Sequence, residues 1–320
     1  MSENDATNCT SQGLSRRSVL SASAALGATV ASLAGQGGAE AASSQAAPNP
    51  LMPVPLPPQV PAKEGMAELP DTRLWYWDTG GNGPPVVLLH PASGSALIWG
   101  YQQPAFAKAG YRVIAYSRRG YYNSAPSSRD KPGIGSEDLH HLVEFLRLTK
   151  FHLVASAAGG SIASDYAFSH QDRLLSLTIS SNSFGVRDGD IARAATGIRP
   201  SGWDDMAVEF RELGPSYRAA DPEGVKRWVE LEHKALVGNN YRQRLANEIT
   251  QARLKELKLR TLLIAGTADL STPPSISRMI AAEIPNSEVV VVPESGHSVY
   301  WEQPDVFNRV VLEFLAKHSK

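Results

Sequence analysis

Cysteine is nearly absent from this chain of 320 residues, whose one cysteine is Cys9. Cys9 precedes the point at which we expect cleavage on export, so the mature chain contains no disulfide, no thiolate metal site and no cysteine nucleophile. A charge excess is also lacking, because the formal net charge is −1. The protein therefore has no overall electrostatic field that would attract it to nucleic acid or anionic lipid. The sequence has no phosphate-binding loop and no dinucleotide fingerprint. We therefore expect no nucleic-acid partner, no cofactor and no metal.

Long hydrophobic runs are missing too, since no stretch reaches the about 20 apolar residues that span a bilayer. The first 41 residues instead have the features of an export signal. The segment Ser15-Arg16-Arg17-Ser18-Val19-Leu20 resembles the twin-arginine motif, and a weakly apolar stretch follows it. Small residues at positions 39 and 41 suit cleavage after Ala41. This pattern predicts export by the twin-arginine machinery to the bacterial periplasm or exterior, with no stable membrane anchor; a disordered tail with a chance arginine pair is the alternative.

Residues 42–65 are crowded with proline, seven of which lie between Pro48 and Pro61. Proline favours an extended chain without core-forming periodicity, so we expect a linker here. The folded domain is then expected to cover residues 66–320.

Strand and helix patterns alternate through this domain. Strands are expected at 72–77, 85–89, 111–116, 151–154, 175–180, 261–265 and 288–292, and helices at 136–148, 161–169, 274–284 and 305–317. Such alternation predicts an α/β fold with a mostly parallel, doubly wound sheet.

The interval 185–258 breaks this alternation, because it contains helical patterns but no good strand. Helices are expected around Trp203–Leu213, Pro222–Leu236 and Tyr241–Leu254. We interpret the interval as a helical lid inserted between two core strands. Trp203 and Trp228 are candidates for contact with a substrate, and ordinary packing within the lid is the alternative for each.

A buried strand pattern at 151–154 runs into a cluster of very small residues and then into a helix. Only small side chains let a strand turn so sharply, and the pattern is the sequence form of a nucleophile elbow, Gly-x-Ser-x-Gly. Aligned on Gly159 and Gly160, Ala157 takes the nucleophile position. In an alternative register Ser156 is the nucleophile, and glycine then follows three residues later rather than two.

Over residues 72–320 the chain resembles the alpha/beta-hydrolase family. Asp269 follows a strand at the position of the family's triad acid, and residues 296–304 match its histidine loop, Gly-His-x-x-x-x-Glu-x-Pro, with His297 as the base. The order of nucleophile position, acid and base is that of the family. The resemblance implies an alpha/beta-hydrolase fold, a site at Ala157, Asp269 and His297, and an oxyanion hole formed by the N–H groups of Ala92 and Ala158.

Alanine has no lone pair, so no acyl-enzyme can form at position 157. Removing the serine from a related triad costs about a millionfold in turnover and leaves roughly 10³–10⁴ over water. Three accounts are open: an engineered substitution that traps substrate, a native alanine with His297 and Asp269 activating water or deprotonating substrate, or a protein that binds a small molecule without catalysis.

The leading hypothesis is an exported hydrolase that acts on an ester, lactone or related carbonyl compound. A lyase, isomerase or cofactor-free oxygenase that uses the same histidine–aspartate pair is a further enzymatic alternative.

Overall fold

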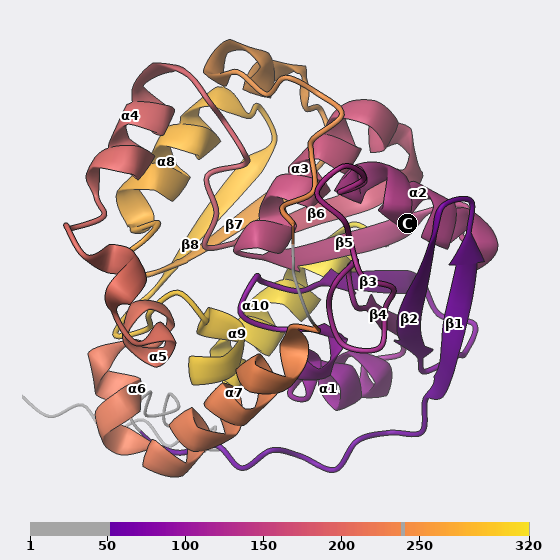
Figure 1. Cartoon of the computed structure of the whole chain (residues 1–320), viewed down its shortest axis with the longest axis horizontal. Helices are drawn as coiled ribbons and strands as arrows, with labels where there is room; N and C mark the ends of the chain where they lie inside the picture. The colour runs from indigo at the N-terminus through magenta and orange to yellow at the C-terminus, as the bar shows by residue number, and fades with distance from the viewer. Residues whose placement is uncertain (1–51, 238–240, 320) are drawn as a thin grey trace, which may run out of the picture. The chain divides into compact units, whose positions relative to one another are not determined.

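An eight-stranded sheet forms the centre of the computed structural model, which describes residues 52–237 and 241–319 (Figure 1). The strands are β1 (Lys63–Leu69), β2 (Thr72–Asp78), β3 (Pro85–Leu89), β4 (Arg112–Tyr116), β5 (Phe151–Ser156), β6 (Leu174–Ser180), β7 (Thr261–Gly266) and β8 (Ser287–Val292). Their order is β1-β2-β4-β3-β5-β6-β7-β8; β2 is antiparallel to β1 and β4, and the neighbours from β4 to β8 are parallel. The expected α/β fold is confirmed.

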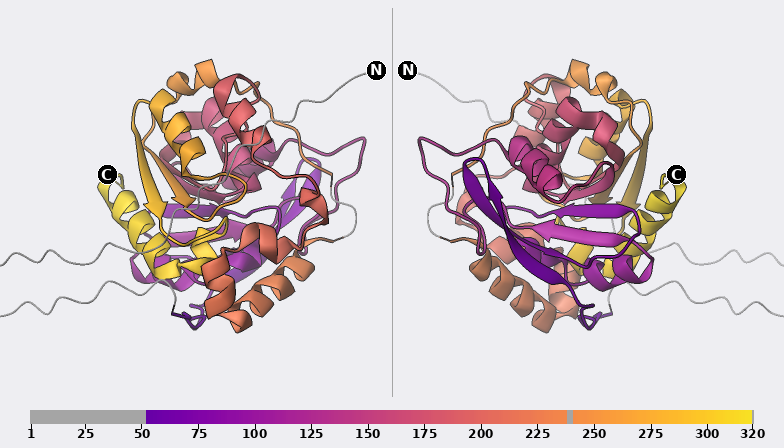
Figure 2. Two further views of the ribbon diagram at one scale, coloured as in Figure 1. Left: turned by 90° about the vertical axis from the view of Figure 1, so that its left-hand side faces the viewer. Right: turned by 90° about the vertical axis from the view of Figure 1, so that its right-hand side faces the viewer.

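Helices cover both faces of the sheet. One face packs against α2 (Gly135–Phe145), α3 (Ala158–His170) and α8 (Pro274–Glu283), and the other against α1 (Gln102–Lys108), α9 (Val299–Glu302) and α10 (Pro304–Lys317). In both views of Figure 2 the sheet lies between the yellow helix α10 and the magenta helix α3. This arrangement explains the apolar runs of β3, β5 and β7. Successive side chains of a central strand point to opposite faces of the sheet, and helices bury both faces.

Strand β1 was not expected, and its first three residues fall in the segment that we assigned to the linker. It forms a hairpin with β2, in which Lys63 pairs with Asp78 and Leu69 with Thr72. Its pattern is mostly exposed, so it shows little of the apolar signal by which a strand is found in a sequence.

The described part of the proline-rich segment contacts the domain. The Tyr101 hydroxyl donates to the Val54 carbonyl at 2.7 Å, and the Gln103 side chain bonds both the N–H and the carbonyl of Val60, at 2.9 and 2.8 Å. Residues 56–61 are thus not a free tether, because Gln59 also donates to the carbonyl of Gly100 at 2.7 Å. The predicted export signal, residues 1–41, lies outside the described residues.

A helical insertion separates β6 from β7, as expected of a lid. It contains α4 (Gly189–Gly197), η3 (Trp203–Asp205), α5 (Val208–Glu212), α6 (Pro215–Ala220), α7 (Pro222–Ala235) and η4 (Gln251–Glu256). In Figure 1, α6 and α7 lie beside α9, and α4 lies beside α8.

The expected helix at Tyr241–Leu254 is wrong except for its end, which is in η4. The N–H groups of Ala246 and Asn247 donate to the carboxylate of Asp165 at 2.8 Å, and the N–H of Arg244 donates to the Gly133 carbonyl at 3.1 Å. These long-range partners take the backbone donors that a helix would use, so tertiary contacts override the local pattern.

The turn from β5 into α3 depends on a glycine. A Cβ atom at Gly159 would lie 2.5 Å from the carbonyl oxygen of Leu89 and 2.7 Å from that of His90. Backbone atoms cannot move aside as a flexible side chain can, so this close approach of β3 to the first turn of α3 requires glycine.

We predict that Gly159→Ala lowers the free energy of unfolding by about 2 kcal/mol, the typical cost of overpacking. Gly197→Ala is the matched control, because a Cβ atom there meets no atom within 4 Å. That control should be neutral or slightly stabilising, since alanine is the better helix former by about 1 kcal/mol. Urea denaturation measures both, and equal stabilities of the two variants would contradict the packing argument.

Candidate active site

The β5–α3 turn is centred on Ala157, which has φ 47° and ψ −123°. A positive φ is uncommon for any residue but glycine, and it marks the sharp strand-to-helix turn of a nucleophile elbow. The Ala157 N–H donates to the Ser180 carbonyl at 2.9 Å, which fixes the turn against β6. Ser156 still belongs to β5; it is fully buried, and its hydroxyl has no hydrogen-bond partner among the described residues. The residue with the positive φ at this turn is therefore Ala157, whereas Ser156 is the last residue of β5.

His297 and Asp269 meet beside the carboxyl ends of the central strands. The Nδ1 atom of His297 lies 2.8 Å from Oδ2 and 2.9 Å from Oδ1 of Asp269. Asp269 also accepts from the N–H groups of Ser271 and Thr272, at 2.8 and 2.9 Å, and from the Thr272 hydroxyl at 3.0 Å. The other ring nitrogen of His297, Nε2, has no hydrogen-bond partner among the described side chains. A histidine held in this way can accept a proton at Nε2.

The electrostatics of the pair favour an ionised aspartate. Burial by itself would raise the pKa of Asp269, but the charge and hydrogen bond of His297 outweigh burial and lower this pKa to about 2. Burial would likewise lower the pKa of His297, and the negative charges of Asp269 and Glu212 raise it above the usual value. The imidazole is thus a stronger base than a free histidine.

A buried carboxylate organises the histidine loop. Glu302 accepts from the N–H groups of Gly214 and Gly296 at 2.8 and 2.9 Å, and from that of Ser298 at 3.2 Å. Gly214 belongs to the lid, whereas the other two residues flank His297. Glu302 therefore joins the lid to the histidine loop and fixes the position of the base.

The segment after β3 is held by Arg118. Its N–H donates to Nε2 of His90 at 3.0 Å, and its guanidinium donates to the Pro91 carbonyl at 3.0 Å. Burial, together with the charge of Arg118, lowers the pKa of His90 well below its usual value, so this ring stays neutral. The N–H groups of Ala92 and Ala158 donate to no backbone carbonyl among the described residues. Their role as the oxyanion hole stays a prediction.

A sequence profile of the alpha/beta hydrolase family matches residues 86–310. The chain belongs to the alpha/beta hydrolase family. It is an enzyme of the alpha/beta-hydrolase type, because its fold and its relatives, which are named hydrolases, agree.

Three similar proteins illustrate the range of this family. The 2-hydroxy-6-oxononadienedioate/2-hydroxy-6-oxononatrienedioate hydrolase of Burkholderia vietnamiensis is 26% identical, covering 77% of this chain and 92% of its own. A thermophilic esterase from Thermogutta terrifontis has a TM-score of 0.65 at 24% identity, covering 81% of this chain and 100% of its own. The enol-lactonase from Burkholderia xenovorans has a TM-score of 0.62 at 22% identity, covering 79% and 100%. At these identities the two structures show the fold alone.

The two tryptophans proposed for this alpha/beta hydrolase differ in their surroundings. Trp228 has no exposed surface and belongs to the apolar cluster beneath α7, and its contact with substrate stays a prediction. Trp203 keeps 8% exposure, and its ring lies 5.6 Å from the guanidinium carbon of Arg199 and 6.0 Å from that of Arg211. Its contact with substrate stays a prediction.

Glu212, the last residue of α5, was not among the predicted site residues. Its carbonyl accepts from the N–H groups of His297 and Ser298 at 2.9 and 3.1 Å, so it lies directly against the histidine loop. An acidic residue on a short lid helix resembles any solvated surface residue, and no sequence signal separates the two cases.

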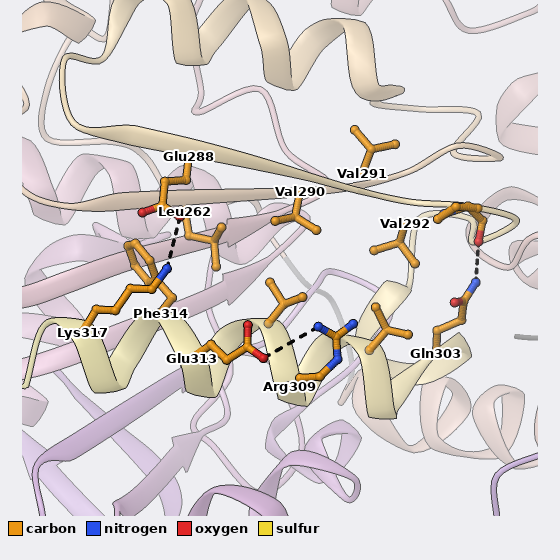
Figure 3. Close-up of a pocket in the computed structure, with 13 residues that line it drawn as sticks. Leu262, Glu288, Val290, Val291, Val292, Gln303, Arg309, Glu313, Phe314 and Lys317 are labelled. Carbon is orange, nitrogen blue, oxygen red and sulfur yellow. Dashed lines mark hydrogen bonds and ion pairs between the residues drawn. The ribbon is translucent and has the colours of Figure 1, made fainter. Parts of the chain in front are cut away.

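A groove of about 530 Å³ lies elsewhere, between β8 and α10 (Figure 3). Val290, Val292 and Phe314 are among its apolar lining residues, and the pairs Glu288–Lys317 and Arg309–Glu313 stand at its sides with N–O distances of 3.9 and 3.7 Å. Ala157, Asp269 and His297 do not line it, so it is separate from the candidate active site.

Residues 52–237 and 241–319 contain eight strands and several helices, but neither a metal cluster nor a membrane-spanning helix. No group of three or more His, Cys, Asp and Glu side chains there could hold a metal ion, although the rings of His140 and His170 stack with their centroids 4.0 Å apart. None of the helices in these residues has the length and apolar character needed to cross a bilayer.

We predict that Glu302→Ala lowers the free energy of unfolding by about 3 kcal/mol, because it leaves buried N–H groups without an acceptor. Glu302→Gln keeps one acceptor oxygen and should lose less. Glu313→Ala, a change in an exposed pair on α10, serves as the surface control and should be within about 0.5 kcal/mol of the wild type. Denaturant titration measures all three, and equal losses in Glu302→Ala and Glu313→Ala would contradict the bracing role.

Proposed function

We propose that this protein is an exported hydrolase that cleaves an ester, a lactone or a related carbonyl compound by direct attack of water. Ala157 stands at the nucleophile position of the elbow, and His297, oriented by Asp269, acts as the general base. The backbone N–H groups of Ala92 and Ala158 hold the negative oxygen that develops on the substrate. No covalent enzyme intermediate forms at position 157.

The observation that carries this proposal is the geometry of the base. Both oxygens of Asp269 lie within 2.9 Å of Nδ1 of His297, and Nε2 has no partner among the described side chains. In a serine enzyme that nitrogen receives the hydroxyl proton. With a methyl group at Ala157, a water molecule is the donor that can occupy the same place, and proton transfer from a positioned water contributes about 10²–10⁴-fold.

The class of substrate is inferred from the named relatives. The three described above are named as a hydrolase of oxo-dienedioates, an esterase and an enol-lactonase. Hydrolysis of an ester or a lactone proceeds by attack on a carbonyl carbon, with negative charge developing on its oxygen. A backbone oxyanion hole serves each of these reactions equally, and Trp203 is the lid residue that we propose to contact the substrate.

Export of the mature chain is the second part of the proposal. It rests on the arginine pair Arg16-Arg17, the stretch of small residues after it and the cleavage pattern ending at Ala41. The twin-arginine machinery moves folded proteins, which suits a domain whose mature sequence has no cysteine. Periplasmic or extracellular location follows from this route.

Turnover of 4-nitrophenyl acetate, 4-nitrophenyl butyrate and dihydrocoumarin tests the reaction. We expect slow, saturable hydrolysis by the wild-type chain and a loss of at least 100-fold in His297→Ala, the lower bound for removing a general base. Product masses that include one water per bond cleaved identify hydrolysis rather than elimination or isomerisation. Absence of turnover in the wild type together with turnover in Ala157→Ser would contradict direct attack by water, and binding without product from any variant would favour a binding protein.

The pH dependence provides a separate prediction. His297 must be unprotonated to accept a proton, so kcat/KM should rise with pH, with a midpoint above 6.5 because Asp269 raises the pKa of His297. Asp269→Asn removes that negative charge and should move the midpoint to lower pH while lowering the plateau about 10⁴-fold, as loss of the orienting acid does in a serine enzyme. A midpoint unchanged by Asp269→Asn would contradict the assignment of the base.

A further inference from the structure

The carbonyl of Pro91, directly after β3 and His90, is held by several donors. Nδ1 of His90 lies 2.7 Å from its oxygen, a guanidinium nitrogen of Arg118 donates to it at 3.0 Å, and the Gly94 N–H closes a turn on it at 3.4 Å. Nε2 of the neutral His90 ring accepts from the Arg118 N–H at 3.0 Å, so the ring proton is on Nδ1, which then donates to the carbonyl. Side chains as well as the turn therefore determine where this carbonyl points.

A fixed Pro91 carbonyl also fixes the N–H that follows it. A peptide unit is planar and almost always trans, so the C=O of Pro91 and the N–H of Ala92 point in opposite directions. Proline fixes its own φ but not the ψ that orients the next peptide, so this orientation depends on the bonds to the carbonyl. Ala92 is exposed, although Pro91 and Ser93 on either side of it are buried. Because the carbonyl faces the buried side chains of His90 and Arg118, the Ala92 N–H points away from them.

The same segment lies against the other predicted oxyanion donor. A Cβ atom at Gly159 would lie 2.7 Å from the His90 carbonyl oxygen, so the segment after β3 touches the first turn of α3. Ala158 begins that helix, and its N–H, like that of Ala92, donates to no backbone carbonyl among the described residues. An oxyanion hole needs two such N–H groups in a fixed arrangement, which requires the peptide before Ala92 to keep its orientation.

Arg118 is a buried cation that forms no ion pair with a carboxylate among the described residues. It is 8% exposed, and its guanidinium carbon lies 4.6 Å from the centre of the Tyr121 ring. The next residue, Arg119, by contrast bonds the carboxylates of Asp71 and Asp138, each at 2.6 Å. A buried charge that only stabilises a fold is usually paired with an opposite charge. Arg118 instead directs its charge to a peptide carbonyl, which points to a role in the site.

We propose that Arg118 is a positioning residue, which fixes the peptide between Pro91 and Ala92 so that the Ala92 N–H stays directed at the carbonyl oxygen of the substrate. The inference rests on the proposed function. A cation bound to the carbonyl end of a peptide also polarises it, because hydrogen bonds in a chain strengthen one another. Arg118 therefore makes the Ala92 N–H a stronger donor to the developing negative oxygen without touching the substrate.

Arg118→Met tests the inference, with Arg173→Met as the matched control. Arg173 also donates to backbone carbonyls, those of Leu148 and Thr149, at 2.6 and 2.8 Å. It directly precedes β6, at the amino end of that strand, whereas the candidate site lies at the carboxyl ends of the strands. Arg118→Lys is the conservative variant, because lysine keeps the charge but lacks the planar fork of donors.

Two substrates that differ in one atom provide the readout, 4-nitrophenyl acetate and its thiono analogue, in which sulfur replaces the carbonyl oxygen. Sulfur is the weaker hydrogen-bond acceptor, so only the oxygen ester benefits fully from the N–H pair. Removing an oxyanion donor costs about 10²–10³ in kcat, and a misdirected donor in Arg118→Met should cost about tenfold with the oxygen ester. We expect KM within about twofold of the wild type and a preference for oxygen over sulfur that falls about threefold or more. Arg118→Lys should lie between Arg118→Met and the wild type, and the pH midpoint should not move, because His297 is unchanged.

The outcomes separate this inference from the proposed function. If the wild type is active, but Arg118→Met and Arg173→Met have the same kcat and the same preference for oxygen, Arg118 does not position the donor and the proposed function stands. Equal losses with both substrates, together with a lower melting temperature, indicate a structural role and also overturn the inference. If Arg118→Met does not fold, wild-type kcat and preference in Arg118→Lys overturn it instead. Absence of turnover in the wild type overturns both.

Discussion

The sharp backbone turn at Ala157 is the constraint on which the site depends. A non-glycine residue at φ 47° costs on the order of 1–3 kcal/mol, and such strain persists only where the surroundings determine it. Here the Ala157 N–H bonds β6, and Gly159 lets the first turn of α3 approach β3 closely. Together these contacts direct the first N–H of α3 and the residue at 157 to the edge of the sheet where Asp269 and His297 also lie.

The backbone conformation of the elbow does not depend on a nucleophilic side chain at position 157. The backbone N–H groups are independent of the side chain at 157, so the oxyanion hole that we propose does not require a hydroxyl there. The proposed base is fixed as well, because Asp269 bonds the His297 ring and Glu302 bonds the backbone on either side of His297. In the proposed function, the alanine removes one nucleophilic atom, and a water activated by His297 replaces it.

Sequence patterns predicted the parts of the molecule that local chemistry determines. The dry central strands β3, β5 and β7 follow from apolar runs, and Asp269 and His297 follow from motifs in a fixed order after strands. The exposed hairpin strand β1 lacks an apolar pattern, so the sequence does not reveal it. In residues 241–250, backbone N–H groups that a helix would use internally donate instead to the Asp165 carboxylate and the Gly133 carbonyl. The burial of Trp228 and the position of Glu212 arise only when the lid packs on the core, so neither could be predicted from its neighbours in the sequence.

The central claim is that water, and not a side chain, attacks the substrate. Rapid quenching of the wild-type chain during turnover of 4-nitrophenyl acetate, followed by intact-protein mass spectrometry, tests it most directly, with Ala157→Ser as the reference that can form an acyl-enzyme. The account predicts no mass increase by an acetyl group in the wild type at any time during turnover. An acetylated wild-type chain that forms and decays at the rate of turnover would contradict it.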